Sequence, residues 1–441
     1  MIAKILLLLI PLKIFSVKIA GLDLTFFRVS LVVFTMISLM KMIVFRRYRK
    51  IFYEISKSPI MRAILYFSIY MTFSTAFAFV TNTSLLYRTV YTYLSMLSYI
   101  LFFSYVVSIE AIAHKGSYFN IFRDVSKFWY FCVALAIPQL IFSLLGINIS
   151  YEHIGEAAPE NVVTIAGIDI LRPNSLFGEP RDYAALLVGI LLMYQFLFKK
   201  TSMKVAIWLF WLGIGFFTGS VTYILFLITF FGYVLFFEKN SNEIKYAKEM
   251  KVLLLFSLVM VAIISYFYAD LILPRVTNYI ALAAAGNLEV GGDLYAQAVD
   301  WIVALYVFDI ITLNKNILLS LFGNGIGSFN SVIDAYFVSL FNYSPVSEGE
   351  LLGSRFLPFT ILVELGIVGL IFILYLIIES FRQIANLDSF SPRKKRDFKR
   401  WFIAFFIGGM VSASYIFMIG PVFVMIISYY EDSHRQLRKK N

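Results

Sequence analysis

Apolar runs long enough to cross a membrane recur along the whole of this 441-residue chain. A helical crossing needs about 17–25 mostly apolar residues, and runs of this kind lie near 2–20, 24–45, 60–80, 87–109, 125–147, 182–198, 252–270 and 356–380. Two longer stretches, 204–237 and 401–430, each favour a pair of short helices with a polar turn between them. The sequence therefore predicts an all-α polytopic membrane protein of about 12 transmembrane helices, with 1–441 as a single integral membrane domain.

Composition supports this fold class. The chain is 60% hydrophobic and its mean hydropathy is +0.81, which is more apolar surface than a water-soluble protein of this length can bury. The runs are continuous rather than alternating, which excludes a β-barrel. No small-residue cleavage site follows the first run, so we expect a retained helix rather than a cleaved signal. The single cysteine, Cys132, and the three scattered histidines exclude an internal disulfide and predict no metal site and no cofactor.

Basic clusters mark one side of the membrane. They lie at 46–50, 199–200, 393–396 and 438–440, and the positive-inside rule places them, with both chain termini, in the cytoplasm. The formal charge of +11 is therefore attributed to topology and to attraction to anionic lipids, with no role in nucleic-acid binding. Carboxylates are concentrated in two other stretches, which we expect to be long extracytoplasmic loops that contain the functional residues: about 147–182 and 271–355.

The first of these loops ends in a candidate anion site. Pro180 suits the first turn of a helix, where its missing N–H is not needed, so the positive end of that helix is expected to face outward. A second helix of the same orientation is expected to start near residue 356. The arginines beside these helix starts or in the outer loops are the candidates for binding a diphosphate, because guanidinium groups match phosphate oxygens in bidentate fashion: Arg172, Arg181, Arg275 and Arg355. The alternative is that each arginine pairs with a neighbouring carboxylate or extends to lipid headgroups.

Further residues of interest lie around the second loop. Glu364 is expected about 12 Å below the external end of its helix, at 1.5 Å per residue, where a carboxylate requires a polar cavity or a partner. It could be catalytic or it could tether another residue, and the sequence slightly favours the structural role. The glycines of 323–327 predict a tight turn, and the apolar spacing in 294–313 predicts an amphipathic helix.

Three segments resemble extracytoplasmic motifs of the bacterial O-antigen and capsule repeat-unit polymerases of the Wzy type. They are RPNSLFGEP at 172–180, FGNGIGSF at 322–329 and LVELGIVGL at 362–370. The spacing from Arg355 to Gly366 also resembles an arginine-to-glycine spacing in functional loops of that family. The resemblance covers 160–380 and implies a GT-C-like arrangement with two large outer loops. It also implies supporting roles for four residues: Glu364, Gly366, Gly323 and Gly325.

The resemblance implies a glycosyltransferase that uses an undecaprenyl-diphosphate-linked oligosaccharide as its donor, without a metal ion, at the outer face of the bacterial inner membrane. A polymerase transfers the growing chain to the incoming lipid-linked repeat unit and so builds O-antigen, capsular or exopolysaccharide. An O-antigen ligase, which transfers the chain to lipid A–core, commonly has a histidine where this chain has Arg355. The absence of that histidine favours a polymerase, for which the lipid bilayer, a flippase and a chain-length regulator would be partners.

The site hypothesis combines both lines of reasoning. Arg172 and Arg355 would hold the donor diphosphate and stabilise the charge that develops on it, while Glu179 or Asp182 would accept a proton from the acceptor hydroxyl. Two alternatives stay open: a ligase or other lipid-linked glycan transferase, and a polysaccharide-lipid transporter or flippase. A transporter is expected to have internal repeats and interrupted helices with polar residues at the midplane, and the two halves of this sequence do not look alike.

Overall fold

The structure of the protein is a computed structural model. The structure describes residues 1–12, 16–19, 22–81, 86–113, 118–147, 149–150, 155–156, 162–165, 168–177, 180–198, 205–218, 220–237, 255–256, 259, 293–312, 317–341, 357–411 and 415–440.

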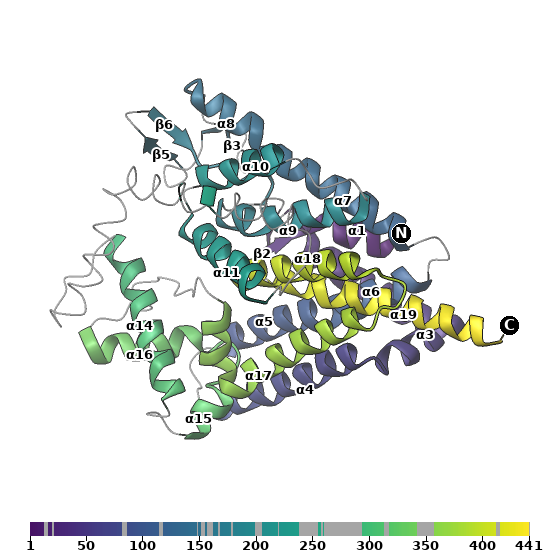
Figure 1. The fold of residues 1–441 in the computed structure, drawn as a ribbon. Helices are drawn as coiled ribbons and strands as arrows, with labels where there is room; N and C mark the ends of the chain where they lie inside the picture. Colours follow the sequence, from purple (N-terminus) through teal and green to yellow (C-terminus); the bar gives the residue numbers. More distant parts are fainter. Residues whose placement is uncertain are drawn as a thin grey trace.

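The described part of the chain is a bundle of α-helices with three small antiparallel hairpins (Figure 1). The helices of the N-terminal half are α1 (Ile2–Leu9), α2 (Phe26–Val44), α3 (Arg46–Ser56), α4 (Pro59–Thr81), α5 (Leu86–Leu97), α6 (Phe103–Ala113), α7 (Tyr118–Ala134), α8 (Ala136–Leu144) and α9 (Pro180–Phe198). They are followed by α10 (Val205–Phe217), α11 (Val221–Phe237), α14 (Asp293–Ile311), α15 (Ile317–Phe322), α16 (Phe329–Phe341), α17 (Leu357–Ala385), α18 (Pro392–Val411) and α19 (Ile419–Lys440). The hairpins pair β1 (Ser16–Ile19) with β2 (Leu22–Thr25), β3 (Ile149–Ser150) with β4 (Gly155–Glu156), and β5 (Val162–Ile165) with β6 (Ile168–Leu171).

Five described helices are long and apolar enough to cross a membrane: Phe26–Val44, Pro59–Phe77, Thr92–Ala113, Asn120–Leu144 and Leu357–Ala385. The prediction of a helical membrane protein is confirmed at this level. The total of about 12 spans at the usual length per crossing, and the side on which each loop lies, stay predictions. Most of the apolar run at 252–270 falls outside the described residues.

The N-terminal run departs from its prediction. A span over 2–20 was expected, but α1 ends at Leu9 and 16–19 forms a strand paired with 22–25. Pro11 follows the end of α1 and cannot continue its hydrogen bonding, while the sequence SVKI alternates polar and apolar residues as a strand does. The prediction of one continuous first helix is therefore wrong. By contrast, 204–237 does divide into two helices, and the division falls at 218–220 as predicted.

The helix α9 packs against four other helices of the bundle, α7, α10, α11 and α18. Near its start, the carbonyl of Ala185 lies so close to Gly408 of α18 that a β-carbon on Gly408 would collide with it. Near its end, Phe196 stacks on Phe398 near the start of α18, with ring centroids 5.3 Å apart. The helices α9 and α18 are therefore antiparallel.

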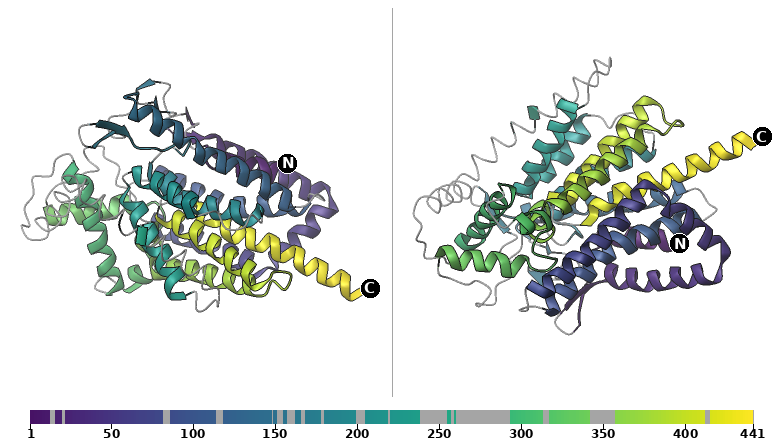
Figure 2. Two further views of the ribbon diagram at one scale, coloured as in Figure 1. Left: turned by 45° about the horizontal axis from the view of Figure 1, so that its top comes forward. Right: turned by 90° about the horizontal axis from the view of Figure 1, so that it is seen from below.

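The helices α9 and α17, whose N-termini are expected to face outward, run in the same direction. α17 and α18 pack together and are joined by a short connection, which makes them antiparallel neighbours. Because α9 is also antiparallel to α18, α9 and α17 begin at the same end of the bundle. The basic segment 393–396 lies at the opposite end, where α17 finishes. Figures 1 and 2 show α14, α15 and α16 at the end where α17 begins, and the chain's C-terminus beyond the end where α17 finishes.

A second, smaller core joins α14 and α16 to the first turns of α17. It is formed by Ile302, Val303, Tyr306, Val307, Ile310, Phe329, Ile333, Phe337, Leu362 and Val363. The segment expected from its spacing to be a helix over 294–313 is thus α14, and its apolar face packs on α16 and α17. These helices cover the end of α17 at which the candidate site lies.

Candidate functional site

The glycine-rich turn at 323–328 has an unusual backbone. Gly323, Gly325 and Gly327 have φ values of +75°, +91° and +80°, a region that residues with a β-carbon rarely adopt. A fourth glycine, Gly366, has a φ of 63° and a ψ of −165° and interrupts the helical geometry of α17. The tight turn was predicted from the sequence, whereas the break in α17 was not.

The turn lies directly against this break. A β-carbon on Gly323 would collide with the backbone carbonyl group of Glu364, and one on Gly366 would collide with the carbonyl group of Leu321. The two glycines therefore allow two backbones to approach more closely than any other residue would permit. The sequence segments 322–329 and 362–370, which are far apart in the chain, form one structural unit.

The break frees α17 carbonyl groups that other elements satisfy. Three of them accept hydrogen bonds from outside α17: Val363 from the Asn324 N–H at 3.0 Å, Glu364 from the Gly325 N–H at 2.8 Å, and Leu365 from the Tyr70 hydroxyl at 2.6 Å. The Tyr70 hydroxyl on α4 also lies 3.0 Å from the carbonyl of Phe322. An interrupted helix can persist in an apolar environment only when its freed backbone groups are satisfied in this way.

The Glu364 side chain joins the turn to the helix that follows it. It is buried, with 2% of its surface exposed, and its Oε1 accepts from the backbone N–H groups of Gly327 at 3.0 Å and Phe329 at 3.4 Å. Phe329 is the first residue of α16, so the carboxylate lies at the positive end of that helix. Its other oxygen, Oε2, has no hydrogen-bond partner among the described residues. One oxygen thus supports the turn, and the other is a buried acceptor.

Polar side chains of α14 and α16 complete this region. The Asn324 amide donates to the Tyr306 hydroxyl at 2.9 Å and to the Val363 carbonyl at 3.0 Å. The Tyr336 hydroxyl donates to Asp309 Oδ2 at 2.9 Å, and its ring meets that of Tyr306 edge-on at 5.5 Å. Burial, together with the hydrogen bond to Asp309, raises the pKa of Tyr336 to about 12. The Tyr336 hydroxyl therefore stays protonated and acts as a donor at neutral pH.

The other motif segment, 172–177, is packed into the bundle. Its buried members are Pro173, Asn174, Ser175 and Phe177. Gln139 of α8 secures them, because its Oε1 accepts from the N–H groups of Ser175 at 2.7 Å and Asn174 at 3.3 Å, and its amide nitrogen donates to Asn174 Oδ1 at 3.0 Å. Ser175 adopts a positive φ of 53° and donates its hydroxyl to the carbonyl of Cys132 on α7. The sequence placed this segment at the end of a loop, and the structure shows that it is held by hydrogen bonds to α7 and α8.

Two predicted site residues flank the start of α9. Arg172 is half-buried, and its Nε donates to the Thr218 carbonyl just after the end of α10, at 2.6 Å. α9 begins at Pro180, as predicted, and Asp182 is a buried carboxylate in its first turn, with 6% of its surface exposed. Arg172 is therefore anchored to a helix C-terminus, and a carboxylate occupies the first turn of the helix whose positive end was expected to bind an anion.

The remaining candidates cannot be placed. Glu179, Arg275 and Arg355 lie outside the described residues, and for Arg181 the structure describes the helical backbone alone. The assignment of a diphosphate to these arginines therefore stays a prediction. The structure shows that α9 and α17 begin at the same end of the bundle.

Sequence reasoning missed the residues that hold the motif segments in place. Gln139 and Tyr70 belong to apolar runs, and neither stood out as a candidate. A signal did exist for Gln139, since an uncharged amide in such a run must find hydrogen-bond partners within the protein. Tyr70 gave no comparable signal, because tyrosines are frequent in this chain.

No family model matches the chain, and a search of curated proteins found no match.

Proposed function

We propose that the protein is a polysaccharide polymerase that joins polyprenyl-diphosphate-linked oligosaccharide repeat units at the outer face of a bacterial inner membrane. The observation that supports this most strongly is the packing of the turn at 322–329 against the interrupted α17. Two of the three segments on which the resemblance rests are one unit, held by Glu364 and its backbone partners. The third segment, which precedes α9 in the chain, is held by Gln139 of α8.

The reaction assigns a task to each candidate. The bond between the donor sugar's anomeric carbon and the diphosphate oxygen breaks, and a bond from that carbon to the acceptor hydroxyl oxygen forms. Negative charge that develops on the leaving diphosphate would be stabilised by Arg172 and Arg355. The proton of the acceptor hydroxyl would pass to Asp182 or Glu179. Asp182 suits this task because it is a buried carboxylate beside the segment that contains Arg172.

One observation favours a second candidate function. An interrupted transmembrane helix with a buried carboxylate beside the break is a feature of transporters, and α17 has both in Gly366 and Glu364. The break lies about a third of the way along α17 rather than at its middle, where a transport site is expected. Movement of a lipid-linked glycan across the bilayer is therefore the alternative that the first experiment must separate from polymerisation.

The experiment uses the full chain reconstituted in liposomes with a cognate lipid-diphosphate-linked repeat unit. Gels and mass spectrometry would resolve the products, and a reagent confined to the outside would report movement of the lipid-linked glycan across the bilayer. We expect a ladder spaced by one repeat unit. Movement of the intact substrate without a ladder would instead support the transporter.

Arginine variants test the proposed roles. Arg172→Ala and Arg355→Ala are each expected to cost about 2–4 kcal/mol of transition-state stabilisation, by analogy with the loss of one oxyanion donor. Arg123→Ala is the matched control. Arg123 is an exposed arginine near the start of α7, whereas the 172–177 segment contacts α7 near its end, at Cys132. Arg172 also bonds the Thr218 carbonyl, so the melting temperature of each variant must show that it is folded. Full activity in both folded variants would rule out the proposed roles.

A further inference from the structure

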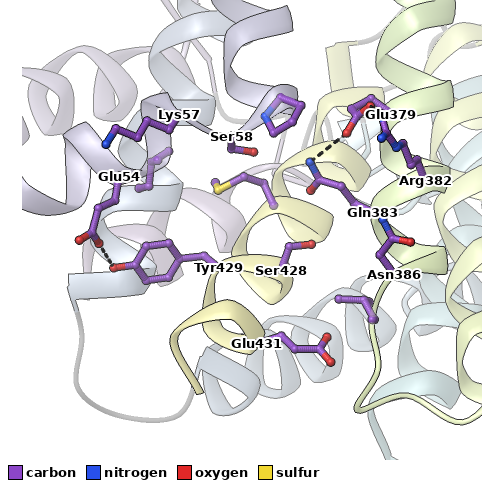
Figure 3. A pocket seen from close by; sticks show the side chains of 14 residues that line it. Glu54, Lys57, Ser58, Glu379, Arg382, Gln383, Asn386, Ser428, Tyr429 and Glu431 are labelled. Atoms are coloured by element: carbon purple, nitrogen blue, oxygen red, sulfur yellow. Dashed lines mark hydrogen bonds and ion pairs between the residues drawn. The ribbon is translucent and has the colours of Figure 1, made fainter. Parts of the chain in front are cut away.

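A polar cavity lies at the end of the bundle that contains the basic segments, far from the glycine turn. It has a volume of about 470 Å³ and is enclosed by the end of α3, the start of α4, the end of α17 and α19 (Figure 3). That volume is within the range of about 300–1,000 Å³ typical of small-molecule sites. None of the residues assigned to the proposed polymerase reaction lines it.

The cavity contains charges of both signs. Glu54, Glu379 and Glu431 line it together with Lys57 and Arg382, so carboxylates exceed cations by one (3 − 2). Arg382 and Glu379 are only loosely paired, at 3.7 Å. Figure 3 shows Glu54 and Lys57 on one wall and Glu379 and Arg382 on the facing wall. A ligand with one positive and one negative group would complement both sets.

Two buried polar atoms at the cavity have no hydrogen-bond partner within the described chain. They are Ser428 Oγ and Gln383 Oε1. Buried polar atoms are nearly always hydrogen-bonded in proteins, so these two residues of the cavity lining have hydrogen-bonding capacity that the described chain does not use. A hydroxyl and an amide oxygen can both accept a hydrogen bond from an ammonium group.

An apolar groove adjoins the cavity. It has a volume of about 610 Å³, runs between α4 and α17, and shares Pro59, Glu379 and Arg382 with the cavity. Its walls include Tyr66 and Ile371, which are 56% and 57% exposed. Both helices are candidate membrane spans, so this exposed apolar surface faces the position of lipid chains. A polar cavity continuous with an apolar groove has the shape and chemistry of an amphiphile.

We propose that the cavity and the groove together bind one phospholipid with a zwitterionic, primary-amine headgroup of the phosphatidylethanolamine type. Its ammonium group would meet Glu54 and Glu431, its phosphate would meet Arg382 and Lys57, and an acyl chain would follow the groove. Over the cavity and the groove together, the three carboxylates are matched in number by three cations, Lys57, Arg382 and Arg62. A headgroup of zero net charge that bears both signs therefore complements the site better than one that is only anionic. By the positive-inside rule this lipid would belong to the cytoplasmic leaflet.

The test is lipid binding to the delipidated full chain, measured by native mass spectrometry. Phosphatidylethanolamine, phosphatidylcholine and phosphatidylglycerol with identical acyl chains would be titrated separately. We expect phosphatidylethanolamine to bind about tenfold more tightly than either of the others, which is about 1.4 kcal/mol. Phosphatidylcholine keeps the charge but has no ammonium N–H to donate, and phosphatidylglycerol has no ammonium.

Variants separate this site from a generally basic surface. Arg382→Gln is expected to weaken phosphatidylethanolamine binding about tenfold, which is about 1.4 kcal/mol, and its exposed side chain makes unfolding unexpected. Arg393→Gln is the control, because Arg393 is an exposed arginine at the same end of the bundle and outside the cavity. Glu54→Gln should remove the preference over phosphatidylcholine. Equal binding of the three lipids, a preference for phosphatidylglycerol, or equal effects of Arg382→Gln and Arg393→Gln would overturn the proposal.

Discussion

Replacing Gly323 with alanine should destabilise the protein strongly, because two costs coincide there. Gly323 has a φ of +75°, and its β-carbon would collide with the Glu364 carbonyl group. The left-handed conformation costs a residue with a side chain about 1–2 kcal/mol, and an added group in a tightly packed site costs about 1–3 kcal/mol. We therefore expect Gly323→Ala to lower the free energy of unfolding by about 2–5 kcal/mol.

Alanine variants at two other glycines measure the backbone cost separately from the packing cost. Gly146 has a φ of +80° with nothing within 4 Å of an added β-carbon, so Gly146→Ala reports the backbone term alone and should cost about 1–2 kcal/mol. Gly213 lies within α10, in open space and without a positive φ. Gly213→Ala should stabilise the protein by about 0.5–1 kcal/mol, because glycine loses more conformational freedom on folding than alanine.

The assay is unfolding of the three variants in detergent micelles, by titration with a denaturing detergent and by the thermal midpoint. The expected order of stability is Gly213→Ala, then the unmodified protein, then Gly146→Ala, then Gly323→Ala. If Gly323→Ala were as stable as Gly146→Ala, the turn would not lie against α17, and the union of the two motif segments would be wrong.

Three further predictions concern the hydrogen bonds of the same regions, and unfolding in detergent checks each. Glu364→Ala leaves two buried N–H groups without their acceptor and should cost about 1–3 kcal/mol, whereas Glu364→Gln keeps an acceptor oxygen and should cost less; equal losses would argue against this role. Tyr70→Phe removes the donor to the freed carbonyl and should cost about 1–3 kcal/mol, while Tyr66→Phe, at an exposed position of the same helix, should change little. Gln139→Ala should cost about 1–3 kcal/mol and make the chain near Ser175 more sensitive to protease; unchanged cleavage would show that Gln139 does not hold it.

Local patterns in the sequence predicted several of the helices, because a transmembrane helix is determined mainly by its own apolar length. Pro180 at the start of α9 and the division of 204–237 are of this kind. Three alternating glycines likewise predicted the turn at 323–327, since positive φ values select glycine. These features need no knowledge of what lies beside them.

The break in α17 could not be predicted in this way. Gly366 and Gly369 both lie in the same apolar run, yet only Gly366 has a positive φ. What distinguishes them is contact with a turn about 40 residues earlier in the chain, and no local pattern encodes that contact. The packing of the segment at 172–177 could not be predicted for a related reason, because Gln139, which accepts its backbone hydrogen bonds, lies on another helix.

The interruption of α17 also constrains how the two motif segments can change. Its freed carbonyl groups are satisfied by the turn on one side and by Tyr70 of α4 on the other, and an unsatisfied group in an apolar environment costs several kcal/mol. Loss of either partner would therefore favour closure of α17 into a continuous helix, with the consequence that Glu364 would no longer face the start of α16. A rigid catalytic scaffold and a moving transport hinge differ on this point. The hydrogen bonds from two separate elements, and the close approach of Gly323 to Gly366, favour a rigid scaffold, which is the arrangement that the proposed polymerase requires.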